Sequence, residues 1–228
     1  MTSRIIALCG CLTWVLTGCL ASGIEEDASE AAIGQDEAVD EASSALGPPH
    51  FQIVDTTFQG DCGGVTPIIN TLAGSPAIEL VFPDLSVQAD DQTPHARKLC
   101  NVRVQVQIDP GYKLSLNRVF YQGRADIDPL GGSGTVSARA FFHGLPGIDG
   151  FKRFNPGYAD NFTVDVTRGT PGTVCGGDTY LNLLVDLTAR QQPGNGSFSD
   201  IAIQRGSAEP DPSRRVVIWC GVLVDTCR

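Results

Sequence analysis

The chain has 228 residues and a formal net charge of −10 at pH 7. The acidity is concentrated near the amino terminus: residues 21–44 hold eight acids and no base, whereas the chain from residue 49 onward holds 18 acids and 15 bases. A nearly neutral body offers no cationic surface for phosphates, which argues against nucleic acid as a partner, and it gives no reason to expect attraction to anionic lipid.

The amino terminus has the features of an export signal. A single positive charge precedes a short apolar run, residues 5–16, which is too short to span a bilayer. Leu16-Thr17-Gly18-Cys19 resembles a bacterial lipobox, so residues 1–19 are predicted to be a signal peptide and Cys19 the lipidated residue. Leu20 follows the cysteine, which by resemblance to bacterial lipoproteins implies a lipid anchor at the outer membrane or cell surface. The alternative is an ordinary signal peptide and release to the extracellular space.

Residues 20–49 are predicted to be an acidic linker without any aromatic residue. Such a segment cannot bury enough apolar surface to offset the entropy cost of ordering, and its like charges repel. We therefore expect a disordered, extended spacer. A propeptide that is removed after export, or a solvated tail with no further role, would be the alternatives.

The remaining chain, residues 50–228, alternates apolar and polar residues in short runs between Gly- and Pro-rich turns and shows no 3.6-residue periodicity. This pattern predicts one all-β domain, an antiparallel β-sandwich of about ten short strands stapled by disulfides. The predicted strands are residues 51–57, 77–82, 98–108, 114–127, 135–143, 161–167, 180–188, 198–204 and 215–224.

The clearest alternation runs through residues 98–108, where Val102, Val104 and Val106 fall on one side and polar residues on the other. Asp109-Pro110-Gly111 ends this strand, because Pro lacks an N–H and Gly permits a positive φ. A second alternating run follows directly. The two strands are therefore predicted to pair as an antiparallel hairpin.

Two later segments carry specific expectations. Residues 144–158 are rich in Gly and Pro and are predicted to be a long irregular loop. If exposed together, Phe151, Phe154 and Tyr158 in this loop would form a patch that binds carbohydrate or protein. Residues 215–224 have apolar side chains on both sides of the alternation, which predicts a central strand covered on both faces.

Five cysteines lie in the body: Cys62, Cys100, Cys175, Cys220 and Cys227. Because exported chains meet oxidising conditions, we expect the pairs Cys62–Cys100 and Cys175–Cys220, each of which joins a loop cysteine to a strand cysteine. Cys227 would then be a free thiol, an intermolecular bridge or the actual partner of Cys175. A metal site is disfavoured, because no C-x-x-C pair is present and the histidines are scattered. No cofactor is expected.

Several short motifs occur together in a fixed order. They are Gly60-Asp61-Cys62-Gly63-Gly64, Arg97-Lys98-Leu99-Cys100-Asn101-Val102, Asp109-Pro110-Gly111-Tyr112, Tyr121-Gln122-Gly123-Arg124-Ala125, Ile127-Asp128, Cys175-Gly176-Gly177, Leu181-Asn182 and Trp219-Cys220. This set resembles a small secreted domain-of-unknown-function family of fungi and bacteria with four spaced cysteines. The sequence departs from it at Gly63, where the family has Pro, and at Thr173-Val174, which lead into the third cysteine. The resemblance implies an exported β-rich domain and supplies no reaction.

Candidate catalytic residues are few. No Ser lies in a Gly-x-Ser-x-Gly elbow, and Asp90-Asp91 offers too few ligands for calcium. Asp126 and Asp128 alternate on one side of a strand and are expected to face solvent together. We therefore predict an exported, lipid-anchored, non-catalytic binding or structural module of the cell envelope, whose partner would be an envelope glycan or protein. The alternative is a secreted hydrolase that acts on polysaccharide through surface carboxylates.

Overall fold

The computed structural model describes residues 49–72, 74–194, 196–203 and 216–227. The predicted signal peptide, Cys19 and nearly all of the predicted linker lie outside this part of the chain. The described residues contain no helix, and so none that could cross a membrane. Their strands are β1 (Phe51–Gly60), β2 (Thr66–Leu72), β3 (Ser75–Phe82), β4 (Ser86–Ala89), β5 (His95–Ile108), β6 (Tyr112–Asp126), β7 (Ser133–Phe142), β8 (Ile148–Phe154), β9 (Ala159–Thr167), β10 (Gly177–Arg190), β11 (Ser199–Ile203) and β12 (Val216–Thr226).

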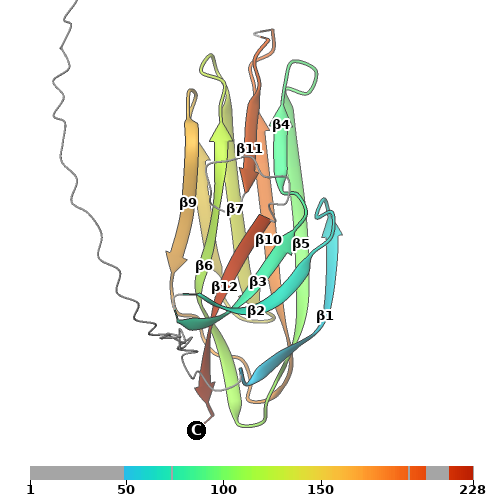
Figure 1. Ribbon diagram of the computed structural model, residues 1–228, viewed down its shortest axis with the longest axis vertical. Coiled ribbons are helices and arrows are strands. Elements are labelled where there is room, and N and C mark those ends of the chain that lie inside the picture. Colours follow the sequence, from blue (N-terminus) through green and yellow to red (C-terminus); the bar gives the residue numbers. More distant parts are fainter. Residues whose placement is uncertain (1–48, 73, 195, 204–215, 228) are drawn as a thin grey trace, which may run out of the picture. The chain divides into compact units, whose positions relative to one another are not determined.

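The strands form two antiparallel sheets that face each other as layers (Figure 1). Sheet A has the order β1-β5-β10-β7-β8, and sheet B has the order β2-β3-β12-β6-β11-β4. β11 and β12 pair with successive stretches of one edge of β6, and β9 pairs with its other edge. The predicted all-β antiparallel sandwich is confirmed, with twelve described strands where about ten were expected.

The core lies between the two sheets and follows the alternation in the sequence. Val102, Val104 and Val106 of β5 are fully buried, whereas Arg103 on the other side of the strand is exposed. Each such buried aliphatic side chain contributes about 1.5–3 kcal/mol. Both sheets supply the largest fully buried side chains, among them Tyr121, Phe82, Phe142, Phe154, Ile78 and Leu80.

The predicted hairpin is wrong, although both of its strands exist. β5 pairs with β1 and β10 in sheet A, whereas β6 pairs with strands of sheet B. The turn at residues 109–111 carries the chain from one sheet to the other, with Gly111 at φ 87° and the Tyr112 N–H donating to the Asp109 carbonyl over 3.2 Å. Alternation identifies the dry face of each strand but not its partner, and two dry faces that meet across a sandwich core satisfy the same pattern.

The segment predicted as a long loop, residues 144–158, contains an edge strand, β8, which pairs with β7. Gly150 lies in this strand because a side chain would not fit there: a Cβ atom would come within 2.9 Å of Val164 and 3.0 Å of Tyr121. The Tyr121 hydroxyl, which crosses from sheet B, donates to the Gly150 carbonyl oxygen over 3.0 Å. Glycine here allows a close approach between the sheets rather than a turn.

β12 is a central strand, as predicted, because it pairs with β3 on one side and β6 on the other. Ile218, Cys220 and Val222 face the core and are fully buried. The opposite face is covered only in part, since Val217 is buried but Leu223 is 40% exposed.

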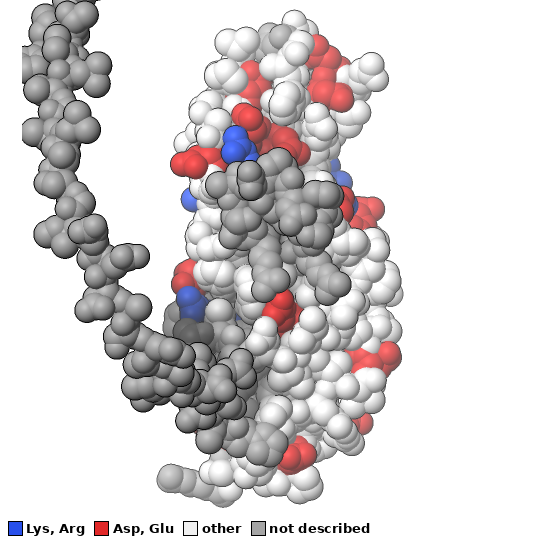
Figure 2. Space-filling model, in the orientation of Figure 1, with Lys and Arg blue, Asp and Glu red and all other residues white. Residues whose placement is uncertain are grey.

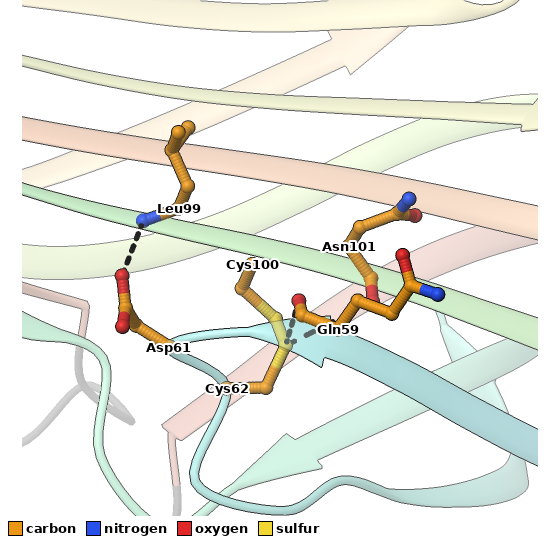
Figure 3. Close-up of a disulfide and its surroundings, with 6 residues drawn as sticks. All are labelled: Gln59, Asp61, Cys62, Leu99, Cys100 and Asn101. Atoms are coloured by element: carbon orange, nitrogen blue, oxygen red, sulfur yellow. Dashed lines mark hydrogen bonds between the residues drawn. A yellow bond between two sulfur atoms is a disulfide. The ribbon is translucent and has the colours of Figure 1, made fainter.

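The described residues contain two disulfides, and one of them differs from the expected pair. Cys62 is joined to Cys100, as expected, and Asp61 beside it accepts a hydrogen bond from the Leu99 N–H over 3.3 Å (Figure 3). Cys175 is joined to Cys227, so the predicted Cys175–Cys220 pair is wrong.

The position of Cys220 in the fold explains why it is left out. Its side chain faces the interior from the middle of β12, and burial raises the pKa of its thiol to about 12. Cys175 and Cys227 instead flank one turn, because Gly176 donates to the Tyr112 carbonyl and Cys227 donates to the Gly111 carbonyl, both over 2.8 Å.

Candidate binding face

The three aromatic residues expected to form a patch do not share one surface. Phe151 is 61% exposed on β8, whereas Phe154 is fully buried. The Phe154 ring packs against the rings of Tyr158 and Phe162 with centroid distances of 5.0 Å. Tyr158 is half-buried, and its hydroxyl donates to the Asn161 carbonyl over 2.8 Å. Phe154 is therefore not part of a surface patch, because the alternation along β8 turns it inward and Phe151 outward.

The two candidate catalytic carboxylates do not face solvent together. Asp128 is 1% exposed, and its Oδ1 accepts a hydrogen bond from the Leu130 N–H over 2.9 Å. This carboxylate stabilises the turn that follows β6. Asp126 lies at the end of β6, in register with Asp200 of β11. The expected pair is absent because the strand, and with it the alternation, ends at Asp126.

The acids of the Asp90-Asp91 loop accept hydrogen bonds from nearby backbone and side-chain groups. Asp90 Oδ1 accepts hydrogen bonds from two backbone N–H groups of its own turn. Asp91 accepts hydrogen bonds from the Gln191 side chain and from the N–H groups of Gly194 and Gly196, which ties two loops together. Among the described residues, no group of three or more His, Cys, Asp or Glu side chains is arranged to hold a metal ion.

The ionised Asp200 carboxylate lowers the stability of the folded protein, and this effect depends on pH. Burial raises its pKa, and the neighbouring carboxylates of Asp126 and Asp84 raise it further. The folded protein therefore favours the protonated form of Asp200. The contribution of this residue to the free energy of unfolding is most favourable below its pKa in the unfolded chain, and it is lost as the pH rises through its pKa in the folded protein. Asp200→Asn is expected to raise the urea midpoint of unfolding at neutral pH, and the gain should disappear at about pH 3.

Asp165→Asn is the matched control, since it removes the same charge from a carboxylate with the opposite shift. The Arg118 guanidinium lowers the pKa of Asp165 through hydrogen bonds of 2.6 and 2.7 Å. This substitution should lower the midpoint at neutral pH, and its effect should also fade in acid. Midpoints that move in the same direction for both variants at neutral pH would contradict the opposite pKa shifts of Asp200 and Asp165.

A depression of about 490 Å³ lies on the outer face of sheet A. Every strand of this sheet contributes to it. The side chains that project into it include those of Gln59, Leu99, Asn101, Arg139, Leu184 and Asp186.

The pairing register arranges these side chains in two rows across the sheet. The first row consists of Gln59, Asn101, Leu184, Arg139 and Asp149. The second row consists of Leu99, Asp186, Ser137 and Phe151. The rows lie about 7 Å apart, since side chains on one face repeat every second residue. Leu99 and Leu184 are 45% and 40% exposed, so apolar carbon atoms are available among amide, hydroxyl and charged groups.

Ion pairs hold the charged side chains at the edge of the depression in place. Arg97 donates two hydrogen bonds to Asp186, at 3.0 and 2.6 Å, and Arg139 Nε lies 3.4 Å from Asp149 Oδ1. Such exposed pairs add little to stability, because solvent screens their charges. Their consequence here is orientation, because each guanidinium fixes a carboxylate at the edge of the depression.

The next row along the strands extends the same face. It contains Thr57, Arg103, Asn182 and Phe141. The guanidinium carbon of Arg103 lies 3.6 Å from the ring centroid of Tyr180, a cation–π contact that restrains the long side chain. Amide, guanidinium and aromatic groups therefore continue beyond the depression.

The alternation in residues 98–108 predicts a polar side for one strand of this face, and it predicts no role for that side. One signal was present: Leu99 and Leu184 are apolar residues at outward positions. Their neighbourhood depends on the register between β5 and β10, which pairs Leu184 with Asn101. The alternation within one strand does not contain that information.

Figure 2 shows the charged side chains on one face of the molecule, in the orientation of Figure 1. On this face the acidic and basic side chains of the described residues lie in small separate groups, and most of the described surface carries no charged side chain. No continuous cationic surface is visible among the residues described there.

Comparisons with known proteins identify a family for this chain and distant similarity to solved structures. A family model described as a domain of unknown function, DUF4360, matches residues 50–209. No curated protein matches the chain. Among solved structures, the chain is similar to TmCBM61, solved in complex with β-1,4-galactotriose, with 10% identity over 75% of this chain and 88% of that chain and a TM-score of 0.29. This score is too low to establish a shared fold or ligand.

Proposed function

We propose that this chain, which belongs to the DUF4360 family of domains of unknown function, binds carbohydrate on the outer face of sheet A without catalysing a reaction. The observation that carries the proposal is the depression of about 490 Å³, in which leucine side chains lie among amide, hydroxyl and charged groups. Concave sites that combine apolar surface with a few converging polar groups are typical of small-ligand binding.

The chemistry of a sugar fits this combination. A pyranose ring carries hydroxyl groups around its rim and C–H groups on its faces. Leu99, Leu184 and the exposed ring of Phe151 offer apolar contacts for the C–H faces. Asn101 and Gln59 each offer two N–H donors and an acceptor oxygen for hydroxyl groups.

The charged side chains at the edge of the depression favour binding over catalysis. Asp186 and Asp149 both lie against guanidinium groups, so their oxygens are oriented as hydrogen-bond acceptors. Asp126 and Asp128, the carboxylates considered for a hydrolase, belong to β6 and to the turn after it, in the other sheet. A binding module is therefore the better-supported function.

The proposal includes placement at the cell surface. The lipobox-like Leu16-Thr17-Gly18-Cys19 supports a lipid anchor at Cys19, and the acidic linker would hold the domain away from the membrane. Two disulfides are typical of proteins that fold in an oxidising compartment. A purely structural envelope role is the alternative, and it requires no glycan binding.

A matched pair of substitutions tests the binding face. Leu184 on sheet A and Leu223 on sheet B are both 40% exposed. In a binding assay of the full chain against a panel of cell-wall polysaccharides, Leu184→Ala should weaken binding about tenfold, because it removes apolar contact worth about 1.4 kcal/mol. Leu223→Ala should leave binding unchanged.

Equal effects of the two substitutions would contradict the proposed face. Absence of binding to every polysaccharide would contradict the function and favour the structural alternative. Urea unfolding of both variants serves as the control for stability, where similar small losses are expected.

A further inference from the structure

The outer face of sheet A differs in charge from the rest of the described domain. The described residues hold 11 bases and 16 acids. Five of those bases, all arginines, project from this face, together with only four of the acids. They are Arg97, Arg103, Arg139, Arg153 and Arg190, with Asp55, Asp149, Asp178 and Asp186. The face is therefore slightly cationic, while the remaining described surface is acidic.

Three of these arginines are not neutralised by a neighbour. Arg97 and Arg139 form ion pairs with Asp186 and Asp149, as described above. Arg103, Arg153 and Arg190 are exposed and form no ion pair with any residue that the structure describes. Exposed guanidinium groups with unused N–H donors can bind anions from solution.

The register places the unpaired arginines on both sides of the depression along the strands. Arg103 lies in the row that adjoins it on one side. Arg153 lies in the row that adjoins it on the other side, and Thr188 and Thr135 stand between Arg153 and Arg97 in that row. Arg190 follows one row further. A polymer lying along the strands would meet hydroxyl-bearing and cationic groups beyond each end of the depression.

We infer that the glycan bound on this face is anionic, a polysaccharide whose sugars carry carboxylate groups. The inference rests on the proposed carbohydrate-binding function. A guanidinium presents two parallel N–H groups that match the two oxygens of a carboxylate, which a lysine cannot do, and all five cations of this face are arginines. The depression binds the sugar rings, and Arg103, Arg153 and Arg190 bind the carboxylates of neighbouring sugars.

The experiment compares charged polymers with their neutral counterparts. Binding of the full chain to polygalacturonate and to alginate is measured beside binding to the same polymers after reduction of their carboxyl groups to alcohols. At least one charged polymer should bind about tenfold more tightly than its reduced form, and added NaCl should reduce the difference because these charges are exposed.

Substitutions then test the assigned residues. Arg153→Gln combined with Arg190→Gln should weaken binding to the charged polymer about tenfold and leave binding to the reduced polymer unchanged. Arg124→Gln combined with Arg168→Gln removes the same charge from exposed positions on or after strands of sheet B and should change neither.

The outcomes separate the inference from the proposed function. Equal or tighter binding to the reduced polymers, or binding to neutral polysaccharides alone, would overturn the anionic ligand and leave carbohydrate binding intact. Equal losses in both double variants would show a nonspecific charge effect and would also overturn it. Absence of binding to any charged or neutral polysaccharide would overturn both.

Discussion

Tyr121→Ala is expected to lower the free energy of unfolding by about 3–5 kcal/mol, because it removes a fully buried aromatic side chain that connects the two sheets. The ring belongs to β6 of sheet B, and its hydroxyl donates to the Gly150 carbonyl of sheet A over 3.0 Å. Burial raises the pKa of this hydroxyl, so it remains a donor throughout the accessible pH range. Urea denaturation, followed by circular dichroism, measures the loss.

Two phenylalanine variants separate packing from hydrogen bonding. Tyr121→Phe keeps the ring but leaves the Gly150 carbonyl without this donor, at a cost of about 1–2 kcal/mol. Tyr158→Phe removes a hydroxyl that donates to Asn161 near the surface and should cost less than about 0.5 kcal/mol. If all three variants unfolded at the wild-type urea concentration, the contact between the sheets through Tyr121 would be wrong.

Removal of either disulfide is expected to lower the free energy of unfolding by about 3–4 kcal/mol, because each bridge closes a long loop in the unfolded chain. The bridges join residues 38 and 52 positions apart. The double variants Cys62→Ala with Cys100→Ala, and Cys175→Ala with Cys227→Ala, are compared with wild type by urea denaturation. Both losses should be similar, since the loop length enters only as a logarithm.

Cys220→Ala is the control for the pairing. It removes a buried thiol that forms no disulfide, so both bridges should persist in peptide mapping and only a packing loss of about 1 kcal/mol is expected. Cys227→Ala alone should instead release Cys175 as a free thiol. Release of Cys175 by Cys220→Ala would restore the pairing that the sequence suggested and contradict the structure.

The sequence was sufficient for the class of fold because alternation is a local property. Each valine of β5 that was assigned to the core is buried there. The partner of a strand is not a local property. Two alternating strands joined by Asp109-Pro110-Gly111 could form a hairpin or face each other across the core, and only the packing of the other strands decides between them.

The expectations for Gly150 and Cys220 were wrong for related reasons. Gly150 is typical of a turn, yet it occupies a strand because Tyr121 approaches its backbone from the opposite sheet. Cys220 lies on a strand like Cys100, but it faces the middle of the core, whereas Cys227 lies beside the turn that also positions Cys175. The place of Gly150 in a strand and the partner of Cys175 both depend on contacts between residues far apart in the chain.

The candidate binding face could be predicted only in part. The alternation in residues 98–108 predicts the outward polar side chains of β5, and of the three aromatic residues of the predicted patch only Phe151 projects from this face. Their common surface arises from the register of five strands, which brings Gln59, Asn101 and Leu184 into one row. No pattern within a single segment contains that arrangement.

The most direct measurement of the proposed binding face is a nuclear magnetic resonance titration of the full chain with the polysaccharide fragment that binds best. The side-chain amide signals of Gln59, Asn101 and Asn182 should shift, because these groups lie on the outer face of sheet A. The corresponding signals of Asn70 and Gln122, which belong to sheet B, should stay unchanged. Shifts confined to Asn70 and Gln122 would contradict the proposal that sheet A carries the binding face.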